Sequence, residues 1–387
     1  MKRGLDEIQM GFYQHPDEAA ARLPVSVEDW ENLAREKLAA GPYDYVAGSA
    51  GGGSTMRANL AAFDRWQIRP RVCTDVTRRH IGVTLFGKQL PAPFLLAPIG
   101  VLSILHPDAE LGPARAAAKA GIPYILSNVS TTPMEEVAAA MGESHRWFQL
   151  YPPKDRDLTR SLLERAEKAG YSAVVVTLDS TLLGWRERDL RNGYLPFLTG
   201  QGMGNYFSDP VFLSKLEKPL EQDRDAAVRR ALAEGNNTCF TWSGVDFIRE
   251  QTRLPVLLKG LTHPEDAALA LKHGVDGLIV SNHGGRQLDG AIATLDALPE
   301  IVATVKGRVP ILMDSGIRRG ADVIKALALG ADAVLLGRPY AYALAVAGEL
   351  GVTQVIEALL AQIELQLAIS GRSSVRDLDP SLLARST

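Results

Sequence analysis

Short apolar runs rich in β-branched residues recur along the chain, and each is bounded by glycine, proline or a polar residue. Such runs are typical of strands buried on both faces of a parallel sheet. The eight runs are FLLAP from Phe94, PYILS from Pro123, WFQLY from Trp147, SAVVVTLD from Ser172, PVLLKG from Pro255, GLIVSN from Gly277, PILMDSG from Pro310 and AVLLGR from Ala333. Helical patterns such as Arg156 to Ala169 and Pro264 to His273 fill the intervals. Eight strands alternating with helices predict an α/β fold, a (β/α)8 TIM barrel over residues 94–387.

One interval departs from the regular spacing of these runs. The fifth run begins 83 residues after the fourth, whereas the other runs begin 22 to 33 residues apart. This spacing predicts a long insertion after the fourth strand, about residues 187–240, at the barrel end where active-site covers form. Residues 192–210 of it are rich in glycine, proline and aromatic side chains, and residues 215–230 are densely charged. We expect a mobile lid there.

The chain before the barrel, residues 1–93, is predicted to be a helical extension that packs on it. Within it, Ser26 to Ala40 has helical spacing and opens with Ser26 followed by Asp29 and Glu31, which is a capping-box pattern. Extension, barrel and insertion are expected to form a single domain.

Composition and charge narrow the classes of function. A formal charge of −3 lacks the basic footprint of a nucleic-acid-binding protein. The two cysteines, Cys73 and Cys239, lie far apart, so they support neither a disulfide framework nor a zinc site, and the seven histidines form no metal-binding motif. The first thirteen residues lack the apolar stretch of a signal peptide, and no run approaches the roughly eighteen consecutive apolar residues of a membrane span. We therefore expect a cytoplasmic protein without a metal ion, a nucleic-acid partner or a membrane partner.

Polar residues collect where the predicted strands end, which is where barrel enzymes place their chemistry. They are Ser127, Gln149, Tyr151, Thr177, Asp179, Lys259, Ser281, His283, Arg286, Asp314 and Arg338. Any one of them could be an ordinary solvated side chain at the edge of the barrel. Eleven of them at the ends of seven strands favour a functional site.

The strongest local signal is the segment SNHGGRQ, residues 281–287, in which His283 and Arg286 leave a strand on a Gly-Gly turn. Imidazole has a reference pKa near 6.5, so His283 can accept a proton at neutral pH. Asp179 could orient this imidazole and stabilise the imidazolium that forms. Arg286 and Arg186 carry planar guanidinium groups suited to binding a carboxylate. The substrate is therefore expected to be an acid.

Lys259 and the last two strand ends point to a charged ligand. Lys259 could be a Schiff-base nucleophile or a fixed cation beside a cofactor that becomes negative. The last two strands end in DSGIRRG from Asp314 and LGRP from Leu336, where barrels bind phosphate through backbone amides. The run GQGMG from Gly200 follows no predicted strand and has the wrong spacing, so it does not indicate a dinucleotide loop. These features predict a phosphate-bearing cofactor or substrate.

Through SNHGGRQLD, DSGIRRG, FQLY and LLKG the sequence resembles the FMN-dependent 2-hydroxy-acid oxidizing family, from about Val25 to Leu378. The resemblance implies that FMN is the cofactor. The implied cofactor contacts are Pro98, Ile99, Gly100, Ser127, Gln149, Thr177, Lys259, Ser281, Asp314, Gly316, Arg318, Gly337 and Arg338. In that family Lys259 would stabilise negative charge on the reduced ring, so the resemblance favours the fixed cation over the Schiff base.

The same resemblance implies oxidation of an L-2-hydroxy acid with O2 as acceptor. The implied catalytic and substrate-binding residues are His283, Asp179, Tyr151, Tyr45, Arg186 and Arg286. His283 would be the base for the 2-hydroxyl or the α-hydrogen, with Asp179 as its partner, and the two arginines would bind the carboxylate. The tyrosines would hydrogen-bond the substrate. Family members are usually homotetramers or octamers, so we expect a homo-oligomer.

Within the family, FQLYPPKDRDL, the Gly-Trp-Arg around Arg186, NYFSDPVF and the long insertion are most similar to lactate 2-monooxygenase. Gly100 agrees, because lactate oxidases usually carry alanine there. The missing methyl group would affect retention of pyruvate, which peroxide could then decarboxylate to acetate, CO2 and water. The sequence therefore favours L-lactate as substrate and acetate as product.

Several alternatives remain at the level of sequence. Ser180, Thr181 and Leu182 replace bulkier pocket residues of lactate 2-monooxygenase, and Leu288-Asp289 follows Gln287, which leaves substrate size open. A 2-hydroxy-acid oxidase that releases peroxide is one alternative. A flavin dehydrogenase that passes electrons from a larger hydroxy acid or a hydroxy-lactone to another acceptor is a second. A barrel that binds flavin without catalysis would lack the base or the arginines, and both are present.

Overall fold

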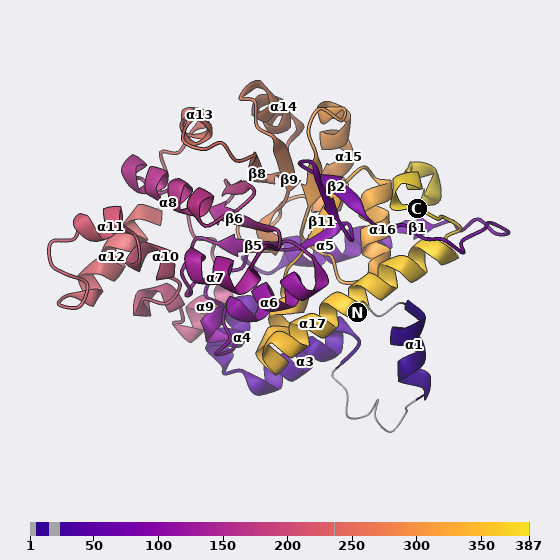
Figure 1. The fold of residues 1–387 in the computed structure, drawn as a ribbon, viewed down its shortest axis with the longest axis horizontal. Coiled ribbons are helices and arrows are strands. Elements are labelled where there is room, and N and C mark those ends of the chain that lie inside the picture. The colour runs from indigo at the N-terminus through magenta and orange to yellow at the C-terminus, as the bar shows by residue number, and fades with distance from the viewer. Residues whose placement is uncertain (1–4, 15–23, 236, 387) are drawn as a thin grey trace.

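The computed structural model describes residues 5–14, 24–235 and 237–386. Eight parallel strands close into a barrel in the order β10-β11-β4-β5-β6-β7-β8-β9 (Figure 1). Their bounds are β4 Phe94–Leu96, β5 Tyr124–Ser127, β6 Arg146–Leu150, β7 Val174–Thr177, β8 Val256–Leu261, β9 Gly277–Val280, β10 Ile311–Met313 and β11 Ala333–Leu336. Each predicted apolar run overlaps one of these strands, so the predicted TIM barrel is confirmed.

Side chains alternate between two apolar layers along the barrel strands. Leu95, Ile125, Val175 and Leu257 belong to a cluster in the barrel interior, and their neighbours along the strands pack against the surrounding helices. Two leucines of a hairpin made of β2 (Val83–Leu85) and β3 (Lys88–Leu90) join the interior cluster. This hairpin closes one end of the barrel. The sequence analysis missed it, because each of its strands has only three residues.

Helices surround the barrel (Figure 1). They are α6 Leu111–Ala120, α7 Met134–Met141, α8 Arg156–Lys168, α14 Pro264–Lys272, α15 Thr294–Val305, α16 Gly320–Ala328 and α17 Arg338–Ile369. The helical patterns predicted over residues 156–169 and 264–273 become α8 and α14. Among the described residues, α17 is the one helix long and apolar enough to cross a membrane, and half of its most apolar window is buried within the fold. Its contacts with α6, α16 and the N-terminal helix α3 account for this apolar character.

The N-terminal extension contains α1 (Leu5–Gln14), α3 (Val27–Lys37), α4 (Ala40–Ala47) and α5 (Ser54–Asp64). As its sequence predicts, α3 begins at a Ser26 cap, whose Oγ accepts a hydrogen bond from the Asp29 backbone N–H at 3.0 Å. The extension also contains β1 (Trp66–Ile68), which pairs with β12 (Leu383–Arg385) near the C-terminus. The sequence analysis predicted neither strand.

The predicted insertion follows β7, the fourth barrel strand. It contains α9 Glu187–Asn192, η2 Pro196–Thr199, α10 Gly204–Phe207, α11 Pro210–Ser214 and α12 Arg224–Gly235, and α13 Trp242–Glu250 follows it before β8. Asn205 is fully buried; its Nδ2 donates to the Asn128 carbonyl at 3.1 Å and its Oδ1 accepts from the Met134 N–H at 2.9 Å. Asp209, also fully buried, pairs with Arg165 of α8 at 3.0 Å. These contacts anchor the first half of the insertion to the barrel, and the mobility of the lid stays a prediction.

Candidate active site

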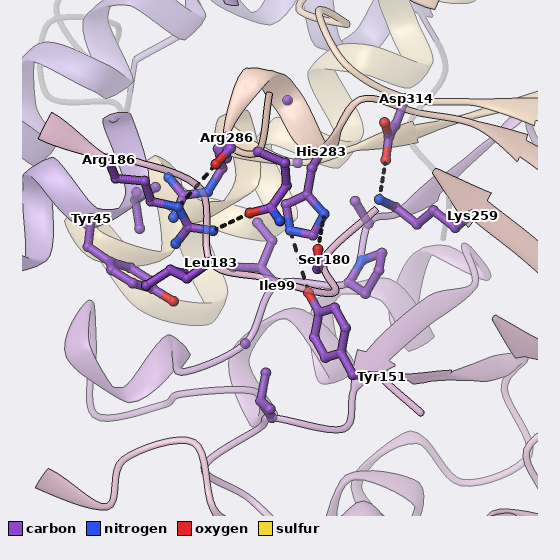
Figure 2. A pocket seen from close by; sticks show the side chains of 18 of the residues that line it. Tyr45, Ile99, Tyr151, Ser180, Leu183, Arg186, Lys259, His283, Arg286 and Asp314 are labelled. Atoms are coloured by element: carbon purple, nitrogen blue, oxygen red, sulfur yellow. Dashed lines mark hydrogen bonds and ion pairs between the residues drawn. The ribbon is translucent and has the colours of Figure 1, made fainter. Parts of the chain in front are cut away.

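A cavity of about 590 Å³ opens at the carboxyl end of the barrel strands, between the N-terminal extension and the insertion. Figure 2 shows part of its lining. The predicted site residues that line it are Tyr45, Pro98, Ile99, Gly100, Tyr151, Arg186, Lys259, His283, Arg286, Asp314, Gly316, Arg318, Gly337 and Arg338. Ser127, Gln149, Thr177, Asp179 and Ser281 do not line it; they lie at strand ends, where Asp179 is half-buried and the other four are buried. The fold thus gathers residues from across the chain into one site.

His283 and Asp179 form a hydrogen-bonded pair, which we call the dyad. His283 follows β9 and has a left-handed backbone conformation with φ 58°. Its Nδ1 lies 2.8 Å from Asp179 Oδ1, so Nδ1 carries the hydrogen and donates it to the carboxylate. Nε2 is then free to accept a proton on the side of Tyr151, whose hydroxyl lies 3.4 Å away (Figure 2). The imidazole is therefore oriented as a base.

The surroundings of the dyad set its protonation. Burial alone would raise the pKa of Asp179, but the charges of His283 and Lys259 outweigh burial and lower it to about 2. Burial lowers the pKa of His283 below its ordinary value; Asp179 opposes this shift and Lys259 adds to it. Burial raises the pKa of Tyr151 to about 12, so its hydroxyl keeps its proton. At neutral pH the site holds an anionic Asp179, a neutral imidazole and a phenol that can donate.

Arg186 and Arg286, which we call the carboxylate clamp, bring two cations to the cavity; Arg186 is buried and Arg286 is half-buried. Arg186 donates from Nη2 to Gln287 Oε1 at 3.1 Å and from Nε to the Arg286 carbonyl at 3.2 Å. Arg286 lies over the Tyr45 ring, 5.1 Å from its centroid. Burial and the nearby Arg186 lower the pKa of Arg286 to about 9. No carboxylate of the described residues lies within ion-pair distance of Arg286, so the clamp favours an anionic ligand.

Lys259 is a fixed cation at the end of β8. Its Nζ donates to Ser281 Oγ at 2.9 Å and lies 3.3 Å from Asp314 Oδ2 (Figure 2). Burial lowers the pKa of Lys259, but Asp314 and Asp179 outweigh burial, and the net shift is upward. The next residue, Gly260, has φ 106°, and a Cβ there would lie 2.7 Å from Asp179 Cβ. This glycine lets Lys259 and Asp179 approach each other at the same edge of the barrel.

Two buried polar atoms near Lys259 have no hydrogen-bond partner among the described residues. They are Gln149 Nε2 and Thr177 Oγ1, at the ends of the adjacent strands β6 and β7. The Gln149 Oε1 is already occupied, because it accepts from Ser127 Oγ at 2.8 Å. A buried polar group without a partner costs about 1–3 kcal/mol, so the two atoms indicate a polar ligand edge at this position.

The two strand ends that the sequence predicts to bind phosphate line the same cavity. Gly316 has φ 104°, and a Cβ there would lie 2.7 Å from the Asn59 carbonyl oxygen, so only glycine fits this turn. Arg338 begins α17 and donates to the carbonyls of Val46, Gly284 and Gly48 at 2.7–3.0 Å. These bonds hold the N-terminal extension against the barrel. Among the described residues, the Arg318 guanidinium donates only to the adjacent carbonyl of residue 317, so it is the freer of the two guanidinium groups for a phosphate.

The structure adds residues that the sequence analysis did not assign to the dyad or the clamp. Ser180 Oγ donates to Asp179 Oδ1 at 3.0 Å and lies 3.2 Å from His283 Nδ1. Gln287 Nε2 donates to the Asp179 carbonyl at 2.9 Å while its oxygen accepts from Arg186. Ser315 has φ 75° and joins Gly284 to Asp314. All three adjoin a motif residue in the sequence, but only their contacts reveal what they support.

Comparison with known proteins agrees with this geometry. The FMN-dependent dehydrogenase family matches residues 34–385. The chain belongs to this family. It is 45% identical to an L-lactate oxidase of Lysinibacillus sphaericus, over 93% of this chain and 92% of the relative. It is 44% identical to the FMN-dependent alpha-hydroxy acid dehydrogenase qulF of Penicillium citrinum, over 98% and 96%. The solved structure of an oxidized active mutant of (S)-mandelate dehydrogenase superposes with a TM-score of 0.85 at 37% identity, covering 94% of this chain and all of the other.

The residues of this FMN-dependent dehydrogenase fit the cofactor. The unpaired atoms of Gln149 and Thr177 match the polar edge of a flavin, Lys259 is a cation close by, and the glycine turns suit a phosphate. When bound, FMN supplies a two-electron acceptor. The protein is therefore an FMN-dependent 2-hydroxy-acid oxidoreductase.

Proposed function

We propose that the enzyme oxidises an L-2-hydroxy acid with O2 as acceptor and releases the 2-oxo acid and hydrogen peroxide, with L-lactate as its simplest substrate. The observation that carries the proposal is that the dyad and the carboxylate clamp line or adjoin one cavity, with Nε2 of His283 free to accept a proton. The 45% identity to an L-lactate oxidase supports the same reaction.

The chain's own side chains have defined parts in this reaction. Arg186 and Arg286 bind the substrate carboxylate and so orient the carbon that bears the hydroxyl. His283 Nε2 accepts one proton from the substrate, and Asp179 stabilises the resulting imidazolium through the 2.8 Å hydrogen bond. The hydroxy acid loses two electrons and two protons to become the 2-oxo acid, and O2 gains both to become hydrogen peroxide.

Gly100 has a packing explanation in this chain. A Cβ on Gly100 would lie 2.6 Å from Val129 Cγ2 and 2.8 Å from the Val129 carbonyl oxygen. Val101 N–H donates to the same carbonyl at 3.0 Å, so the two segments are held together. The close approach of the Gly100 and Val129 segments therefore explains the glycine, which does not provide extra room for pyruvate. Without that argument for product retention, we favour release of peroxide over oxidative decarboxylation to acetate, CO2 and water.

A hydroxy-lactone is a weaker candidate substrate than a hydroxy acid. It has no carboxylate, so it would leave Arg286, which has no ion-pair partner among the described residues, without an anionic partner, whereas Arg186 already lies 4.0 Å from the Asp189 carboxylate. An unpaired buried charge is costly, and the pKa of Arg286, lowered to about 9, reflects that cost. The acid is the ligand that relieves it.

The test is anaerobic mixing of the purified yellow protein with L-lactate, followed by admission of O2 while flavin absorbance, peroxide, pyruvate and acetate are recorded. We expect bleaching, then recovery of colour with one peroxide and one pyruvate for each lactate. Acetate without peroxide would establish the monooxygenase reaction instead, and recovery only with an artificial acceptor would establish a dehydrogenase. Absence of bleaching by every L-2-hydroxy acid tried would overturn the proposal.

A pair of histidine variants assigns the base. His283→Ala should abolish bleaching by L-lactate while the protein still binds FMN. His273→Ala is the matched control, since His273 also pairs with a carboxylate, Asp246 at 2.7 Å, but does not line the cavity. Full turnover by His283→Ala would exclude His283 as the base.

A further inference from the structure

One wall of the active-site cavity carries no charge; we call it the apolar wall. It consists of Val129, Leu182, Leu183, Phe197, Met203 and Leu232. These residues come from five loops or helices, including the loop after β7 and α12 of the insertion. Leu183 precedes Arg186 by only three residues, so the wall begins next to the carboxylate clamp (Figure 2). A substrate whose carboxylate is bound by the clamp therefore has apolar surface within reach of its side chain.

Polar groups beside the wall are already engaged. The Gln287 amide donates to the carbonyls of Asp179 and Leu182, and its oxygen accepts from the clamp. The Ser180 hydroxyl donates to Asp179. Thr181 is exposed, so water satisfies its hydroxyl. A second carboxylate or a row of hydroxyl groups on the substrate would lose water here without gaining partners, which is unfavourable. The wall therefore disfavours hydroxy diacids and sugar acids.

Two leucines of the wall are unusually open to solvent. Leu182 is 60% exposed and Leu183 is 58% exposed, whereas Met203 on the insertion is 3% exposed. Removing apolar surface from water contributes about 25 cal/mol per Å², so any hydrocarbon that covers the two leucines gains binding energy. Leu232 of α12 lines the same cavity. A hydrocarbon side chain that extends from the clamp would lie against all three.

The segment around Met203 packs closely against the loop that follows β5. Gly204 donates from its N–H to the Ser130 carbonyl at 2.9 Å, and a Cβ on Gly204 would lie 2.3 Å from the Thr131 carbonyl oxygen. On the other side, a Cβ on Gly202 would lie 2.7 Å from the Val129 carbonyl oxygen. Because glycine stands on each side of Met203, this part of the wall can lie directly against the loop that follows β5. This part of the wall is therefore a surface held against the barrel, on which a ligand can pack.

Resting on the proposed function, we propose that the preferred substrates are L-2-hydroxy acids with a linear hydrocarbon side chain longer than the methyl group of lactate, and that Leu182, Leu183 and Leu232 determine this preference. A buried methylene contributes about 0.8 kcal/mol, which corresponds to about a fourfold gain in kcat/KM for each methylene that the wall covers. The reaction is unchanged: the 2-oxo acid and peroxide form as they do from lactate.

The experiment measures kcat/KM of the FMN-loaded enzyme for L-lactate, L-2-hydroxybutanoate, L-2-hydroxyhexanoate and L-2-hydroxyoctanoate, with L-malate and (S)-mandelate for comparison. The variants are Leu183→Ser and Leu232→Ser. Leu198→Ser is the matched control, because Leu198 is a 62% exposed leucine of the same insertion that does not line the cavity. Flavin absorbance and melting temperature report folding in every case.

We expect kcat/KM to rise with chain length in the wild type and in Leu198→Ser, and to rise less steeply in Leu183→Ser and Leu232→Ser. A wild type that oxidises L-lactate best, or that prefers L-malate or (S)-mandelate to the linear acids, would overturn the inference and leave the proposed function intact. If kcat/KM increased equally with chain length in the wild type and in all three variants, the role of the leucines would be refuted. If no L-2-hydroxy acid bleached the flavin, the proposed function itself would fail.

Discussion

The variant Asp179→Asn tests the dyad most directly, because it removes a charge with almost no change in shape. Asp179 Oδ1 lies 2.8 Å from His283 Nδ1, and both side chains are shielded from solvent. A hydrogen bond to a charged group contributes about 1.5–3 kcal/mol. The contribution is largest once His283 has taken the substrate proton and become an imidazolium.

If that stabilisation is lost only in the transition state, kcat/KM falls about 10- to 100-fold. Ser180→Ala is the matched control at the same ring nitrogen, since Ser180 Oγ lies 3.2 Å from His283 Nδ1 and is uncharged. Ser180 Oγ also donates to the Asp179 carboxylate, but it does so in the ground state as well as in the transition state, so this variant should lose less kcat/KM than Asp179→Asn, no more than about tenfold. The difference between the two variants isolates the charge of Asp179.

The pH profile gives a second readout with a defined sign. Burial and Lys259 lower the pKa of His283, and Asp179 opposes that shift. The wild-type kcat/KM should therefore fall on the acid side only below pH 6.5, where the imidazole becomes protonated and can no longer accept a proton. In Asp179→Asn the opposing charge is gone, so the pKa of His283 decreases further and the acid limb moves to lower pH.

Anaerobic rapid mixing with L-lactate, read as flavin bleaching between pH 5 and 9, measures both effects before oxygen enters. FMN binding is checked by absorbance, so that loss of cofactor is not mistaken for loss of rate. Two results would refute the assignment of Asp179 as the partner of the base. One is a maximal kcat/KM in Asp179→Asn equal to that of the wild type, and the other is an acid limb of its kcat/KM profile displaced to higher pH.

Three further predictions concern ligand binding and stability. Pyruvate should give the unpaired Arg286 an anionic partner and so increase the free energy of unfolding of the holoenzyme by about 2.7 kcal/mol at a hundred times its Kd. A higher melting temperature with pyruvate, and an unchanged one with neutral acetamide, is the expected result. Asn205→Ala should reduce the free energy of unfolding by about 1–3 kcal/mol in a urea titration, because the buried Met134 N–H loses its acceptor; an unchanged midpoint would contradict this. Gly100→Ala should cost about 1–3 kcal/mol in the same titration, because its Cβ would displace Val129, and it should leave the ratio of peroxide to acetate as in the wild type.

The barrel itself could be predicted from the sequence because its signal is local. A strand such as β7 is a continuous apolar run, and its burial on both faces leaves no alternation to obscure it. The same holds for His283 and Arg286, which share one short motif at a strand end. Lys259 was recognised as a candidate from its position, but its state as a fixed cation depends on Asp314, which is distant in the sequence.

Other features depended on pairs of segments that only folding brings together. The β2–β3 hairpin is identifiable by the interior cluster that it covers, and β1 by its pairing with β12 at the opposite end of the chain. Strands of three residues carry too few positions for a periodic signal, so tertiary pairing alone specifies them. The anchoring of the insertion through the buried Asn205 has the same origin.

For this protein, the sequence by itself determined the strands of the barrel and the residues available for acid–base chemistry, since each strand and each motif is encoded within a few consecutive positions, and the resemblance of those motifs to a known family implied the cofactor. Only the tertiary structure decided what Gly100 and Leu183 contribute, because the space around a side chain is made by segments distant in the sequence. Val129 fills the space in front of Gly100, and Leu183 is left 58% exposed. Contact and exposure are properties of the folded chain, and they distinguish a packing glycine from a catalytic one and a substrate-facing leucine from a core leucine.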